Sequence, residues 1–166
     1  MHCFPDICYK SKVCDLTDEI DILSSFAGQA FGQCENKSMK EDLLKILNLT
    51  YRLMGKLRDN CDFVKEDKLM LKEIKNRYDK KGEKIRKHIF ILPQGDLLAG
   101  NLHICRALSK KVSRMFSKAK SEITFEASEI EEAINMLSDI FYNMALCTNY
   151  ENNVEEIPVV LIPERK

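Results

Sequence analysis

The 166-residue sequence contains few of the residues that interrupt regular structure, with 6 glycines, 4 prolines and no tryptophan. No apolar run approaches the roughly 20 residues that a membrane-spanning helix needs, and the opening MHCFPDICYK lacks the apolar core of a signal peptide. The 26 basic and 26 acidic residues cancel, which gives no overall electrostatic reason to bind nucleic acid or a membrane surface. We therefore expect one cytoplasmic, mostly helical domain over residues 1–166.

The seven cysteines form no CxxC pair, and an odd number spread along the chain is typical of reduced thiols. Zinc binding by Cys3, Cys8, Cys14 and His2 is an alternative, but their spacing is not that of a compact zinc knuckle. A carboxylate-bridged metal bundle needs Glu-x-x-His pairs, and none of the three histidines follows a glutamate at that spacing. We expect no metal ligands in this chain.

Apolar residues recur every three to four positions in five stretches, which is the spacing of one face of an α-helix. The first three predicted helices cover residues 15–31, 38–59 and 64–81. The fourth follows Asp96 and the fifth begins near Ser128. The expected fold is an all-α, five-helix bundle, with an irregular segment at residues 1–14 and an extended tail at residues 148–166 that can pack on a neighbouring subunit.

Local signals mark the ends of these helices. Gly82 is expected to stop the third helix, and Asp96 can accept hydrogen bonds from the first turn of the fourth. Two patterns of the capping-box type stand at helix starts: Ser38 with Glu41, and Ser128 with Glu131.

Four basic side chains follow one another on the fourth helix at spacings of three, four and four: His103, Arg106, Lys110 and Arg114. Residues so spaced project along one stripe of a helix, and a cationic stripe can hold a polyphosphate. A solvated basic face has the same pattern. The spacing alone leaves both interpretations open.

Three blocks of sequence, in order, resemble the ATP:cob(I)alamin adenosyltransferase family of the PduO type. The central block matches the family pattern at eight positions: Phe90, Leu92, Pro93, Gly95, Leu102, His103, Arg106 and Arg114. The segment TDEI at residues 17–20 looks like the family's Val-Asp-Glu-Leu, and INMLSD at residues 134–139 looks like its Leu-Asn-Arg-Leu-Ser-Asp. Together the blocks span most of the chain.

The resemblance implies a ferritin-like, up-down helical bundle that forms a homotrimer with its active sites between subunits. It implies transfer of the 5′-deoxyadenosyl group of ATP to the cobalt of cobalamin, with triphosphate as leaving group and Mg²⁺ as a cofactor. By the same resemblance, Asp18 pairs with Arg106, and Arg106 and Lys110 bind the phosphates. Asn135 hydrogen-bonds near the nucleotide or corrinoid, and Phe90 excludes water from the lower face of the corrin. Arg106 and Phe90 are thus the expected catalytic residues.

Each of these residues also has a structural interpretation. An Asp18–Arg106 pair and an Asn135 side chain can tie helices together, and Phe90 can belong to the core.

The sequence departs from the family pattern on the nucleotide side. Residues 1–17 contain no glycine and nothing like the family's Gly- and Thr-rich ATP loop. Lys110 and Lys111 replace paired arginines and lose the planar fork of a guanidinium, and Ser113 replaces an acidic residue. The alternative function is therefore a catalytically degenerate trimeric bundle that binds corrinoid or nucleotide or acts as an interaction module.

Overall fold

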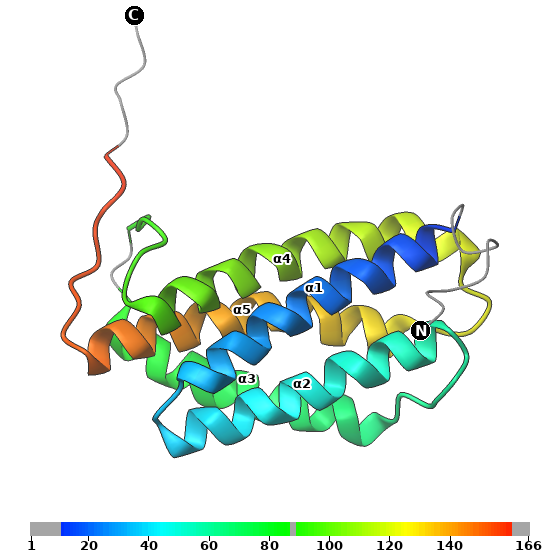
Figure 1. Ribbon diagram of the computed structural model, residues 1–166, viewed down its shortest axis with the longest axis horizontal. Helices are drawn as coiled ribbons and strands as arrows, with labels where there is room; N and C mark the ends of the chain where they lie inside the picture. The colour runs from blue at the N-terminus through cyan, green and yellow to red at the C-terminus, as the bar shows by residue number, and fades with distance from the viewer. Residues whose placement is uncertain (1–10, 87–88, 161–166) are drawn as a thin grey trace, which may run out of the picture.

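The computed structural model describes residues 11–86 and 89–160, and Figure 1 shows how they are arranged. The described chain forms five α-helices and one short 3₁₀ helix: α1 Lys12–Gln33, α2 Lys37–Leu57, α3 Lys65–Ile85, α4 Leu97–Ala119, η2 Lys120–Glu122 and α5 Ser128–Glu151. The predicted all-α class and all five predicted helices are confirmed. Within these ranges, no helix combines the length and apolarity needed to cross a membrane.

The helices pack as an up-down bundle in which α4 is central. Helix α1 lies antiparallel to α4, because Asn101 donates to Gln33 Oε1 at 2.9 Å near one end and the Lys12 N–H donates to Glu122 Oε2 at 2.8 Å near the other. Helix α5 packs against both α4 and α3, and α2 packs mainly against α1. The shared core contains large, fully buried side chains from all five helices: Leu16, Leu43, Tyr78, Phe116 and Phe141.

Helix α2 begins earlier than its predicted capping box. The Asn36 side chain accepts a hydrogen bond from the Met39 N–H at 3.1 Å, so Asn36 is the N-cap and Ser38 lies inside the helix. The Asn36 amide also donates to Glu151 at the end of α5, at 3.1 Å. This contact with a distant residue selects the cap, and the predicted Ser38–Glu41 box is wrong.

The predicted box at the start of α5 is also wrong. Ser128 is the first helical residue, and its N–H donates to Glu126 Oε1 at 2.9 Å. The cap predicted for α4 is confirmed, because Asp96 Oδ1 accepts from the Ala99 N–H at 2.8 Å.

Helix α3 does not stop at Gly82 but continues through it to Ile85. Gly82 is buried against Asn143 of α5, and a Cβ atom at position 82 would overlap the Asn143 Oδ1 atom. Asn143 is fixed there because it accepts from Arg86 at 2.7 Å and donates to Asp79 at 2.8 Å. Glycine at this position therefore allows two helices to approach closely and does not end one of them.

This contact predicts whether replacing Gly82 stabilises or destabilises the protein. Glycine to alanine within a helix normally stabilises a protein by about 0.5–1 kcal/mol. Gly82→Ala should instead destabilise this protein by about 1–3 kcal/mol, because the new methyl group displaces a hydrogen-bonded Asn143. Urea denaturation measures the change, with Gly32→Ala as the control, since a Cβ atom added at Gly32 would have no neighbour within 4 Å. Equal stabilisation by both substitutions would contradict the packing.

The segments outside the helices are shorter than predicted. Helix α1 begins at Lys12, so the irregular segment predicted for residues 1–14 ends earlier, and residues 1–10 lie outside the described chain. Helix α5 continues to Glu151, and the extended segment that follows is described to residue 160. This segment contacts its own chain, where Pro158 forms an antiparallel bridge with Ile91. A contact of the tail with a neighbouring subunit stays a prediction.

Candidate functional site

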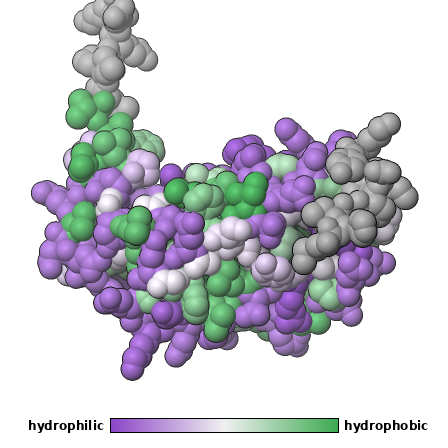
Figure 2. Space-filling view, viewed as in Figure 1, coloured by the Kyte–Doolittle hydropathy of each residue, from purple (hydrophilic) through white to green (hydrophobic). Residues whose placement is uncertain are grey.

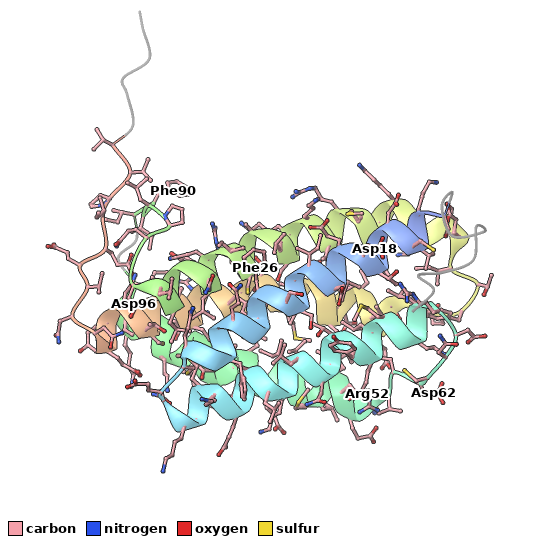
Figure 3. All side chains as sticks on the ribbon, viewed as in Figure 1. Asp18, Phe26, Arg52, Asp62, Phe90 and Asp96 are labelled. Atoms are coloured by element: carbon pink, nitrogen blue, oxygen red, sulfur yellow. The ribbon has the colours of Figure 1, made fainter. Side chains whose placement is uncertain are left out.

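A small hollow forms where the segment before α4 passes over α4 and α5. It has a volume of about 240 Å³, and its lining brings together three residues predicted for the site, Phe90, Arg106 and Lys110. Ser138, Asp139 and Tyr142 of α5 complete one wall. Phe90 is not a core residue, because 79% of its surface is exposed and its ring stands at the end of the bundle (Figure 3). An exposed aromatic ring beside two cations suits a large, partly apolar ligand.

A larger hollow of about 610 Å³ lies beside the first half of α4. Its lining includes Gly95 and Asp96 from the preceding turn and His103 and Arg106 from the helix. Arg106 therefore borders both hollows, and its buried Nε atom has no hydrogen-bond partner within the described residues. A guanidinium group between two cavities is placed to bind an anionic ligand.

His103 differs from the rest of the predicted basic stripe. It is 5% exposed, and burial together with the neighbouring Arg106 lowers the pKa of the imidazole from 6.5 to about 4. Neither ring nitrogen has a partner in the described part of the chain, although the ring lies 6.4 Å from that of Tyr142. His103 is therefore neutral near pH 7, and the predicted cationic stripe does not include it.

Lys111 is engaged by a partner that the sequence analysis missed. Its Nζ lies 2.7 Å from Oε2 of Glu19, a carboxylate of α1 that is only 6% exposed. Lys110, one position earlier, is exposed and borders the small hollow. The two lysines that replace paired arginines therefore differ, because Lys111 neutralises a buried acid and Lys110 faces the site.

Replacing each lysine in turn should change the free energy of unfolding by different amounts. Lys111→Ala leaves the Glu19 carboxylate buried without its cation and should lower the free energy of unfolding by about 1–3 kcal/mol. Lys110→Ala should change it by less than about 0.5 kcal/mol, as for most surface substitutions. Chemical denaturation at pH 7 compares them, and a double variant Lys111→Ala, Glu19→Gln should recover part of the loss. Similar effects of Lys110→Ala and Lys111→Ala would contradict the pairing.

Asp18 and Arg106 do not meet within one chain. The antiparallel register of α1 and α4 puts Arg106 opposite about position 28, which is about ten residues, or ~15 Å, from Asp18. Asp18 is instead 3.8 Å from Arg58, and 73% of its side chain is exposed. Figure 3 shows Asp18 far along α1 from the end that carries Phe90. A pair between subunits stays a prediction.

Asn135 is exposed on α5, one turn before the wall of the small hollow, and accepts from the Ser113 hydroxyl of α4 at 2.6 Å. Ser113 is the residue that replaces an acidic one in the family pattern. The Asn135 amide nitrogen takes no part in this bond and is available to a ligand. A hydrogen bond from Asn135 to the nucleotide or corrinoid stays a prediction.

No group of three or more metal-binding side chains occurs within residues 11–86 and 89–160. Burial raises the pKa of the Cys105 thiol to about 12 and that of Cys147 to about 11, so both are protonated near neutral pH. The zinc alternative depends on His2, Cys3 and Cys8, which lie outside the described chain.

The fold and these hollows define a helical-bundle protein with a candidate ligand site, lined by charged and apolar side chains, at one end of its central helix. The sequence model of the cobalamin adenosyltransferase family matches residues 10–148, and the chain belongs to this family. No curated protein matches the chain significantly.

Solved structures of one bacterial enzyme have the same fold. An Arg-to-Lys variant of the PduO-type ATP:corrinoid adenosyltransferase from Lactobacillus reuteri, complexed with ATP, superposes with a TM-score of 0.78 at 22% identity, covering 91% of this chain and 89% of the other. A Phe-to-Ala variant complexed with cobalamin and ATP gives a TM-score of 0.78 at 21% identity, covering 90% and 87%.

Proposed function

We propose that this protein is an ATP:cob(I)alamin adenosyltransferase. The observation that carries the proposal is the position of Arg106, which borders both the large hollow and the small hollow that contains Phe90 and whose Nε has no partner among the described residues. One cationic side chain can thereby contact ligands in two adjacent cavities. Family membership supports this assignment, and so do the relatives solved with ATP and cobalamin.

In the proposed reaction, the cobalt(I) of the corrinoid substrate attacks the 5′ carbon of ATP. A cobalt–carbon bond forms, the bond from C5′ to the α-phosphate oxygen breaks, and triphosphate leaves with the electron pair. Arg106 and Lys110 stabilise the charge that develops on the leaving group. Phe90 covers the corrin face opposite the attack and keeps water from the cobalt.

Mg²⁺ would accompany the triphosphate and need no protein cage of its own. Among the residues lining the large hollow, Asp96 is the carboxylate, and its two oxygens already accept from the Ala99 N–H and the Asn152 amide. Mg²⁺ commonly binds proteins through substrate phosphates and water. The lining therefore suits a nucleotide that arrives with its metal ion.

The proposed assembly is a homotrimer in which Asp18 of one subunit pairs with Arg106 of the next. Its support is that the antiparallel register of α1 and α4 keeps the two residues too far apart to pair within a chain. Ile22 of α1 and Ile104 of α4 are 45% and 40% exposed, and Figure 2 shows hydrophobic patches across this face. The cytoplasm is the proposed location, in keeping with Cys34, Cys61, Cys105 and Cys147 being free thiols.

A second candidate is a binding protein without turnover. Residues 1–17 lack the glycines of an ATP loop, and Lys111 is committed to Glu19 rather than to a ligand. These losses fall on the nucleotide side and leave Phe90 in place.

Anaerobic incubation with ATP, Mg²⁺ and chemically reduced cobalamin tests the proposal. The expected result is a spectrum of adenosylcobalamin together with stoichiometric triphosphate. Absence of product at micromolar enzyme would reject the assignment, and calorimetry with ATP and with cobalamin would then show which ligand the bundle retains.

A further inference from the structure

The segment that carries Phe90 is attached to the C-terminal segment of the same chain. The Leu92 N–H donates to the Ile157 carbonyl and the Val159 N–H donates to the Phe90 carbonyl, both at 2.8 Å. These two hydrogen bonds form a short antiparallel pair that stands away from the helices at one end of the bundle (Figure 1). The backbone of Phe90 is thus fixed by a strand partner and its ring is left exposed.

Asn149 connects this pair of segments to the bundle. It lies in the last turns of α5, is 0% exposed, and donates one amide hydrogen to the Gln94 carbonyl and the other to Glu156 Oε1, each at 3.0 Å. One side chain therefore holds the segment before α4 and the segment after α5 together. Both amide hydrogens of Asn149 are therefore used. Their acceptors, the Gln94 carbonyl and the Glu156 carboxylate, lie outside the helices.

The turn over Asn149 has a conformation that fits this contact. Gly95 has φ of +144°, which side-chain-bearing residues rarely adopt, and a Cβ atom there would overlap Asn149 Oδ1. The turn can therefore sit directly on the Asn149 amide. Asp96 follows at once and caps α4, which anchors the far end of the turn, so a change at Asn149 is expected to move the free side of the turn that leads to Phe90.

We propose that Asn149 is a positioning residue that sets where Phe90 stands over the small hollow. This inference rests on the proposed function for its catalytic consequence. An amide is required because both of its hydrogens are donated to oxygen atoms. An aspartate at position 149 has the same shape but no amide hydrogens. Its carboxylate oxygens would be repelled by the Gln94 carbonyl oxygen and by the Glu156 carboxylate.

The test uses Asn149→Asp and, as a matched control, Asn153→Asp. Asn153 is exposed on the segment after α5 and has φ of +55°, which aspartate tolerates. Asn149→Ser is a second variant that removes the hydrogen bonds without adding charge. The double variant Asn149→Asp, Glu156→Gln should recover part of the function, because the new amide can donate to the new carboxylate.

A structural readout is available because the chain has no tryptophan. Phe90→Trp introduces a single tryptophan, which can be excited selectively over tyrosine, and its acrylamide quenching and anisotropy report its mobility. We expect Asn149→Asp and Asn149→Ser to increase quenching and lower anisotropy, whereas Asn153→Asp leaves both unchanged. Unchanged fluorescence of the introduced tryptophan in a folded Asn149 variant would overturn the proposal, whether or not the protein is an adenosyltransferase.

The catalytic readout is measured with Phe90 in place. Loss of both hydrogen bonds should raise KM for cobalamin about tenfold or more. KM for ATP should stay within about twofold of the wild-type value. Equal increases in both constants would indicate general disruption and contradict a role specific to Phe90.

Discussion

Lowering the pH from 7 to 4.5 should destabilise this protein by about 2–3 kcal/mol more than it destabilises a His103→Gln variant. Burial and Arg106 lower the pKa of His103 in the folded state to about 4, whereas the unfolded chain titrates near 6.5. Between these values the unfolded state binds the proton and the folded state does not, so stability falls as the pH falls. Below about pH 4 both states are protonated and the loss levels off.

Denaturant titrations at several pH values measure this difference. The remaining acidic groups are the same in both proteins, so subtracting the two pH profiles isolates His103. The groups that face the imidazole are Arg106 on its own helix and Tyr142 of α5, and neither changes in the variant. Parallel profiles for the two proteins would mean that His103 is accessible to protons in the folded state.

Replacing Arg106 with alanine should lower kcat/KM for adenosyl transfer by about 10²–10³-fold, the effect typical of removing one donor that stabilises transition-state charge. Arg106→Lys keeps the positive charge but loses the planar, two-pronged donor geometry of the guanidinium. Its kcat/KM should lie between those of the alanine variant and the wild type. Stability should change little, because Arg106 makes no ion pair within residues 11–86 and 89–160 and its Nε is unpartnered there.

The matched control is Lys118→Ala, an exposed cation near the opposite end of α4. Its kcat/KM should match the wild type, and circular dichroism should show the same melting temperature for all three variants. Activity of Arg106→Ala within about threefold of the wild type would remove Arg106 from the proposed mechanism.

The helices were predictable because their apolar periodicity and the Asp96 cap act within a few residues. Two of the failures, at the start of α2 and at Gly82, involve distant partners. Asn36 replaces Ser38 as the cap of α2 because it also bonds Glu151, far along the sequence. Gly82 lies inside α3 because Asn143 packs on it. Local helix and capping propensities alone make Ser38 the cap of α2 and Gly82 the end of α3.

The resemblance supplied the candidate residues Phe90, Arg106 and Lys110. They line one hollow, and their roles there stay predictions. The spacing on α4 could not distinguish His103 from Lys110, since burial makes one neutral and leaves the other charged. Asn149 was missed because its function depends on two segments that meet only in the folded chain.

The antiparallel register of α1 and α4 has a genetic consequence. In the proposed trimer, each chain contributes Asp18 to one site and Arg106 to another, so the interfaces are head-to-tail and close into a ring. A chain defective at Asp18 and a chain defective at Arg106 can then complement each other. In every mixed trimer one of the sites receives both intact residues, and random mixing would restore roughly a quarter of the wild-type sites.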